Sequence, residues 1–161
     1  QIWVSPWLQR GGVRCRFTLS CSRYGAAVLA HDGFVAGNLR TLDAGLAALR
    51  DALGVAWERS VVLVATEFGR EVAINGTQGT DHGTGGAAFV AGGAVRGGRV
   101  LADWPGLARA QRHEGRDLRV TTDLRAIIKG VLSDHLRLPM STIERTVLPG
   151  SDGLRAVSVL A

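Results

Sequence analysis

The sequence has very little lysine, and this scarcity bears on its charge. Lys129 is the only lysine, although the 161-residue chain carries 19 basic residues against 14 acidic ones, for a net charge of +5. The basic residues are therefore almost all arginine, and no stripe of them is interleaved with aromatic side chains beyond residue 32. A basic stripe of that kind is what nucleic-acid binding favours, so we expect no nucleic-acid partner.

Cysteine and long apolar runs are also scarce. Cys15 and Cys21 are the only two cysteines, and a structural zinc site usually has four ligands in tighter pairs, so we interpret both as ordinary thiols. No apolar run approaches the ~20 residues that span a bilayer, and we expect no membrane span. The first residues lack the pattern of an export signal. Localisation and oligomeric state stay open.

What the sequence does contain is typical of a folded domain. Apolar residues make up 46% of the chain, enough for a core. Residues 1–32 show no sustained strand or helix period and stay unassigned, whereas residues 33–150 are orderly and residues 151–161 form a tail. Leucines at helical spacing predict a helix that Asn38 caps and that runs to about Leu53.

The orderly region alternates strands and helices. The apolar residues 61–65 predict a strand buried on both faces at the centre of a sheet, and residues 87–91 predict a second strand. Asn75-Gly76 between them is a turn signal. A later helix is expected after a cap at Thr121 or Thr122, and residues 141–144 match a capping box for a last short helix. The fold class predicted is α/β, a mostly parallel sheet with flanking helices.

Two segments could carry chemistry. In parallel α/β sheets, ligands bind beyond the carboxyl ends of the strands, and Glu67 emerges at the end of the first strand, with Arg70 close behind it. Glu67 is either a metal ligand or the partner of Arg70 in an ion pair. Asp81 and His82, in the glycine-rich loop before the second strand, are suitable ligands for a divalent ion. The alternative is that both lie on an exposed turn.

These motifs together resemble a known family. The strand at 61–65 runs into Thr-Glu-Phe-Gly-Arg at residues 66–70, followed by Asn-Gly at 75–76, Gly-Thr-Asp-His at 79–82 and a strand end in Gly-Gly at 92–93. With them, the chain resembles the bacterial family known as domain of unknown function 1501, over about residues 33–150.

That family is similar to the alkaline phosphatase and sulfatase superfamily, whose central sheet carries a two-metal site. The resemblance implies a divalent metal, with zinc as the candidate, held by Glu67 and His82, with Asp81 as a further ligand. Phe68 stands where relatives often have a second ligand, so the two-metal set is incomplete. Relatives are typically exported and carry an N-terminal half with a Gly-Trp-Asp-Thr-His segment that residues 1–32 do not match. We therefore expect a C-terminal fragment of the domain that is inactive alone.

Three functions follow from these observations. The first is a fragment of a metal-dependent phosphatase- or sulfatase-like hydrolase, in which Arg70 holds a small anionic ester. The second is a noncatalytic binding or assembly protein of the same fold. The third is a small basic nucleic-acid binder, which salt-dependent binding would reveal. No hydroxyl has a visible paired base, so no catalytic residue is assigned.

Overall fold

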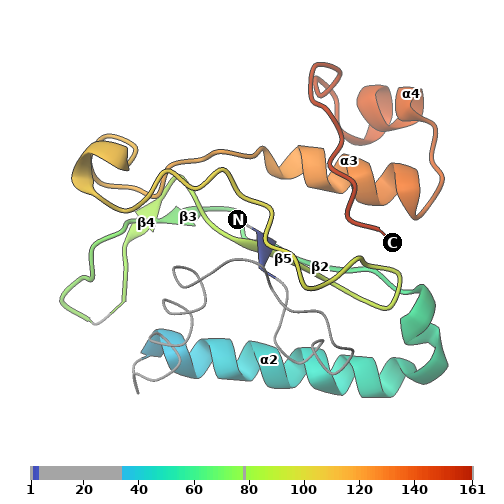
Figure 1. Cartoon of the computed structure of the whole chain (residues 1–161), viewed down its shortest axis with the longest axis horizontal. Helices are drawn as coiled ribbons and strands as arrows, with labels where there is room; N and C mark the ends of the chain where they lie inside the picture. The colour runs from blue at the N-terminus through green and yellow to red at the C-terminus, as the bar shows by residue number, and fades with distance from the viewer. Residues whose placement is uncertain (1, 4–33, 78, 161) are drawn as a thin grey trace.

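The computed structural model describes residues 2–3, 34–77 and 79–160. Figure 1 shows helix α2 on one side of the strands and helix α3 on the other. The predictions for residues 1–32, including both cysteines, fall outside the described residues except at Ile2 and Trp3. Helices and small sheets are mixed along the chain, so the α/β class is confirmed.

Helix α2 (Phe34–Leu53) is followed directly by the 3₁₀ helix η2 (Gly54–Arg59). The helix starts before the predicted cap, and Asn38 lies inside it. The Thr41 hydroxyl donates to the Gly37 carbonyl at 3.1 Å, a bond that spans one helical turn. Asparagine inside a helix costs only a few tenths of a kcal/mol, about 0.7 at most, relative to alanine, so the signal at Asn38 was too weak to set a boundary.

The main sheet has three described strands in the order β1-β5-β2: β1 (Ile2–Trp3), β5 (Ala88–Ala91) and β2 (Val62–Val64). Strand β1 pairs with β5 in parallel, whereas β2 pairs with β5 antiparallel, with Leu63 opposite Val90. The parallel arrangement expected for these two apolar strands is therefore wrong.

The prediction that residues 61–65 are central is also wrong for the described sheet, because β5 occupies that place. In β5, Val90 is 1% exposed and its neighbour Ala91 is 7% exposed. The residues of β2 are only half-buried. A strand covered on both faces is the central one, and an apolar run alone does not distinguish it from a half-covered neighbour.

Between β2 and β5 the chain forms a second, two-stranded antiparallel sheet. Its strands are β3 (Gly69–Arg70) and β4 (His82–Gly83). The loop between them closes where the Asn75 N–H donates to the Gly79 carbonyl at 2.9 Å, which confirms the turn predicted at Asn75-Gly76. This hairpin reverses the chain direction and so returns β5 antiparallel to β2.

The C-terminal third begins with the short 3₁₀ helix η3 (Arg109–Gln111) and continues with α3 (Leu124–Asp134). Asp123, and neither of the predicted threonines, caps α3: its side chain accepts a hydrogen bond from the Arg125 N–H. Helix α4 (Met140–Thr142) then runs into the π-helical turn η4 (Ile143–Val147). The predicted capping box is wrong, because Pro139 is the N-cap and Ser141 lies inside the turn.

The core unites three segments distant in sequence: Val90 from β5, Ile127 from α3 and Val159 from the C-terminal segment. Residues 151–160, set apart as a tail by sequence, thus contribute to the core. They are anchored by the Val157 N–H, which donates to the Ala126 carbonyl at 2.9 Å, and by the Val159 carbonyl, which accepts from the Arg96 N–H at 3.0 Å.

None of the described helices combines the length and apolar character that crossing a membrane requires.

Candidate functional site

Three of the four predicted site residues belong to the β3–β4 hairpin. Arg70 lies in β3, His82 lies in β4, and Asp81 directly precedes β4. The register of the hairpin places Arg70 directly opposite His82. The pairing is extended by the Arg70 N–H, which donates to the Gly85 carbonyl at 2.8 Å, and by the Glu71 N–H, which donates to the Asp81 carbonyl at 2.9 Å. Directly opposed residues of an antiparallel pair project to the same face, so Arg70 and His82 share one face of the hairpin.

Two glycines allow the hairpin to pack this closely. A Cβ atom on Gly83 would collide with the backbone of Arg70 and Glu71, and one on Gly69 would collide with the backbone of Gly85. Only a residue without a side chain fits where two backbones approach in this way. The glycine richness of this segment therefore sets the distance at which Arg70 and His82 face each other.

The ring of Phe68 contacts both of these side chains. Its centroid lies 4.2 Å from that of the His82 ring, with the planes tilted by 39°. The Arg70 guanidinium carbon lies 5.4 Å from the same centroid, within the range of a cation–π contact. The Arg70 Nη1 also donates to the Thr80 carbonyl at 2.8 Å, which fixes the direction of the guanidinium.

Asp81 belongs to a hydrogen-bonded loop centred on Asn75. The Asn75 Oδ1 accepts from the N–H groups of Thr77 at 3.1 Å and Gly79 at 3.0 Å. The Asn75 Nδ2 donates to the Asp81 Oδ1 at 2.8 Å. One oxygen of this candidate ligand is thus already held by an amide, while the Asp81 and His82 side chains both remain exposed.

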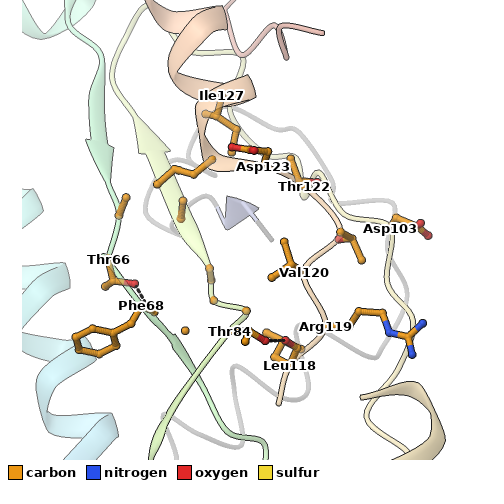
Figure 2. Close-up of a pocket in the computed structure, with 18 of the residues that line it drawn as sticks. Thr66, Phe68, Thr84, Asp103, Leu118, Arg119, Val120, Thr122, Asp123 and Ile127 are labelled. Atoms are coloured by element: carbon orange, nitrogen blue, oxygen red, sulfur yellow. Dashed lines mark hydrogen bonds between the residues drawn. The ribbon is translucent and has the colours of Figure 1, made fainter. Parts of the chain in front are cut away.

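Glu67 lies three residues beyond the end of β2, where it lines a cavity of about 410 Å³. The predicted alternative, an ion pair between Glu67 and Arg70, is not found among the described residues. Figure 2 shows this cavity between the strand end that carries Thr66 and Phe68 and the chain that leads to Asp123, with the Phe68 ring pointing away from it. The structure brings Arg70 and His82 together, whereas Glu67 is one of the residues that line the cavity.

Sequence reasoning missed the far wall of this cavity. Asp103, Trp104, Arg119 and Asp123 line it together with Glu67. They follow no recognisable motif, and the most distant of them, Asp123, lies 56 residues after Glu67 in the sequence. Of these residues, only Asp123 could have been found from the sequence, because it directly precedes a predicted helix. Arg125 donates to its side chain, which holds the pKa of the Asp123 carboxyl below its usual range.

A buried carboxylate holds the two walls together. The Asp117 Oδ2 accepts from the Thr84 N–H at 3.1 Å, and the Asp117 Oδ1 accepts from the Arg116 Nε at 2.7 Å. Asp117 is 2% exposed. The hydrogen bond from Arg116 is the largest influence on its pKa, which lies below the ordinary value although burial opposes this.

The candidate ligands fit a divalent ion in their chemistry but not as a complete set. Carboxylate and imidazole groups suit zinc, which takes at least three protein ligands in its sites. Within residues 34–77 and 79–160, no group of three or more His, Cys, Asp or Glu side chains is gathered as a metal site would require. Glu67, Asp81 and His82 therefore do not close a metal shell.

The chain matches a known protein family. The model of a family described as "Protein of unknown function (DUF1501)" matches residues 31–147. This range contains the hairpin, Glu67 and the cavity walls. No curated protein and no solved structure matches the chain.

Proposed function

Since the chain belongs to the family of unknown function DUF1501, we propose that it is part of a metal-dependent phosphatase- or sulfatase-like hydrolase domain of the alkaline phosphatase superfamily. The observation that carries the proposal is the pairing of Arg70 and His82 on one face of a glycine-packed hairpin. An arginine and an imidazole on one face can donate several hydrogen bonds to a single anionic group.

Arg70 is the residue that binds the anion in this proposal. Its Nη1 is engaged with the Thr80 carbonyl, but a guanidinium has five N–H donors in a fixed plane. The remaining donors are directed by that anchor and lie on an exposed side chain. A phosphate or sulfate ester oxygen is the acceptor that such a fork binds in bidentate fashion.

We assign the metal to Glu67, His82 and Asp81, and a bound divalent ion would act there as a Lewis acid on an ester oxygen. Because these side chains do not form a closed shell in the described residues, metal affinity is weak. Around the hairpin and the cavity, the hydroxyls of Thr66, Thr77 and Thr84 donate to carbonyl or amide oxygens, and not to a carboxylate or an imidazole. We expect the chain by itself to show no measurable phosphatase or sulfatase activity.

Two binding titrations, both measured by calorimetry, test the proposal. Inorganic phosphate should bind the wild-type chain, and Arg70→Met should weaken binding about tenfold or more, since a hydrogen bond to a charged group contributes about 1.5–3 kcal/mol. Zn²⁺ should bind weakly and be lost in His82→Ala and Glu67→Ala. Glu58→Ala, an exposed carboxylate away from the hairpin, is the control and should change neither affinity.

The second candidate, a noncatalytic binding or assembly protein of the same fold, is favoured by the incomplete ligand set. It predicts that neither phosphate nor Zn²⁺ binds through these residues. Metal-dependent turnover of an aryl phosphate or sulfate that disappears in Glu67→Ala would show instead that the isolated chain is an active enzyme.

A further inference from the structure

The pairing of Arg70 with His82 raises a physical question about the hairpin. A guanidinium can only donate hydrogen bonds, and among the described residues the Arg70 guanidinium donates to the Thr80 carbonyl and not to the His82 ring. Yet the register holds Arg70 and His82 in direct opposition. A third side chain is therefore needed to keep both groups in place when no anion lies between them.

The Phe68 ring is placed to do so. It lies 4.2 Å from the His82 ring and 5.4 Å from the Arg70 guanidinium carbon, centroid distances at which stacking and cation–π attraction both operate. The ring is 38% exposed, so it does not serve mainly to fill the core. The Thr66 hydroxyl donates to the Phe68 carbonyl at 2.8 Å, which fixes the backbone from which the ring projects.

We propose that Phe68 is a positioning residue: its ring holds the His82 imidazole and the Arg70 guanidinium side by side, ready to bind one anionic group together. The inference rests on the proposed function and adds a role for the residue that breaks the expected ligand pattern. Side chains that are already held lose less conformational entropy on binding, and each such side chain otherwise costs about 0.5–1.5 kcal/mol. Phe68 thus contributes to affinity without touching the anion.

Two variants at position 68 and a control variant elsewhere in the hairpin test this role. Phe68→Leu keeps an apolar side chain but removes the ring, whereas Phe68→Tyr keeps the ring. Ile74→Ala is the matched control, because Ile74 is an apolar side chain of the same hairpin that is 78% exposed. Circular dichroism first establishes that each variant is folded like the wild type.

The first measurement is spectroscopic. In the wild type, the His82 ring protons should show a ring-current shift in the NMR spectrum and nuclear Overhauser effects to the Phe68 ring. Both should vanish in Phe68→Leu and persist in Phe68→Tyr and Ile74→Ala. The second measurement is the affinity for inorganic phosphate, which should fall about three- to tenfold in Phe68→Leu and return in Phe68→Tyr.

The outcomes separate the two proposals. If the wild type binds phosphate and Phe68→Leu binds it equally well, Phe68 has no positioning role, although the proposed function stands. A Phe68→Leu protein that keeps the shifted His82 signals would overturn the positioning role as well. If the wild type binds no phosphate, the proposed function fails and this inference fails with it.

Discussion

Asp117 is a buried carboxylate whose pKa links stability to pH. The hydrogen bond from Arg116 and the one from the Thr84 N–H hold its pKa below the ordinary value of 3.8. The unfolded chain therefore takes up a proton before the folded chain does as the pH falls. The resulting stabilisation is present above the unfolded pKa and is lost as the pH falls through that value toward the folded pKa.

We expect Asp117→Asn to be less stable than the wild type near neutral pH and to lose less stability on acidification. Urea unfolding from about pH 6 down to about pH 2 measures both effects, because this window contains the unfolded pKa and extends below it, where the stabilisation is lost. Asp152→Asn removes an exposed carboxylate and serves as the control. Parallel stability curves for wild type and Asp117→Asn below about pH 4 would contradict the assignment.

Lys129 is a buried cation with all of its hydrogen-bonding capacity in use. It is 1% exposed, and its Nζ donates to the Glu144 Oε1 at 2.7 Å and to the carbonyls of Ser151 at 2.7 Å and Leu154 at 2.8 Å. An ammonium has three donors, so every one is satisfied. The single lysine of this arginine-rich chain stands where a compact charge is needed to join α3 to the C-terminal segment.

Replacing Lys129 by methionine should lower the free energy of unfolding by about 3–5 kcal/mol, because it leaves a carboxylate and two carbonyls without their donor. Arg145→Met, which removes an exposed cation, should change stability by less than about 0.5 kcal/mol. Chemical denaturation measures both variants. A Lys129→Met protein as stable as the wild type would mean that these acceptors find water instead.

At the scale of elements, the start of α3 offers two residues that could act as its N-cap. The Asp123 Oδ1 accepts from the Arg125 N–H at 2.8 Å, whereas Thr122, one of the two caps predicted from the sequence, is an exposed residue before it. Asp123→Ala should therefore destabilise the protein by about 1 kcal/mol. Thr122→Ala should stay within about 0.5 kcal/mol of the wild type. Thermal unfolding of the two variants decides which residue caps the helix.

The order and direction of strands were the least predictable features of the fold. The apolar pattern located both β2 and β5, but it carries no information on which strand is central or how the two are oriented. The decisive signal was Asn75-Gly76, a dipeptide typical of hairpin turns. A hairpin inside the connection returns the next strand antiparallel, whereas a parallel pair needs a crossover.

The candidate site was predictable only in its local part. Arg70 and His82 come together through a hairpin of neighbouring segments. The motifs had marked both residues, but as an ester-binding residue and a metal ligand rather than as a facing pair. The wall opposite Glu67, with Asp103 and Asp123, is assembled by tertiary packing. The link between Asp117 and Thr84 joins residues 33 positions apart, and no local pattern predicts such a contact.

At the scale of the whole molecule, one core joins three distant parts of the chain. Val159 is 2% exposed and packs with Val90 of β5 and Ile127 of α3. Gly130 lets the C-terminal segment lie against α3, because a Cβ atom there would collide with the Val157 carbonyl. Strand, helix and C-terminal segment therefore stabilise one another, and we expect them to unfold as one unit.

Val159→Ala tests this cooperativity. The loss of two methyl groups and the cavity left behind should lower the free energy of unfolding by about 2 kcal/mol, and Ser158→Ala, at an exposed neighbour, should change it by less than about 0.5 kcal/mol. Hydrogen exchange provides the more specific test. If the three parts form one cooperative unit, amides of β5 and α3 lose protection by the same amount in Val159→Ala, because all of them exchange through the same unfolding event. Loss of protection restricted to residues near the C-terminus would show instead that this segment opens independently of the core.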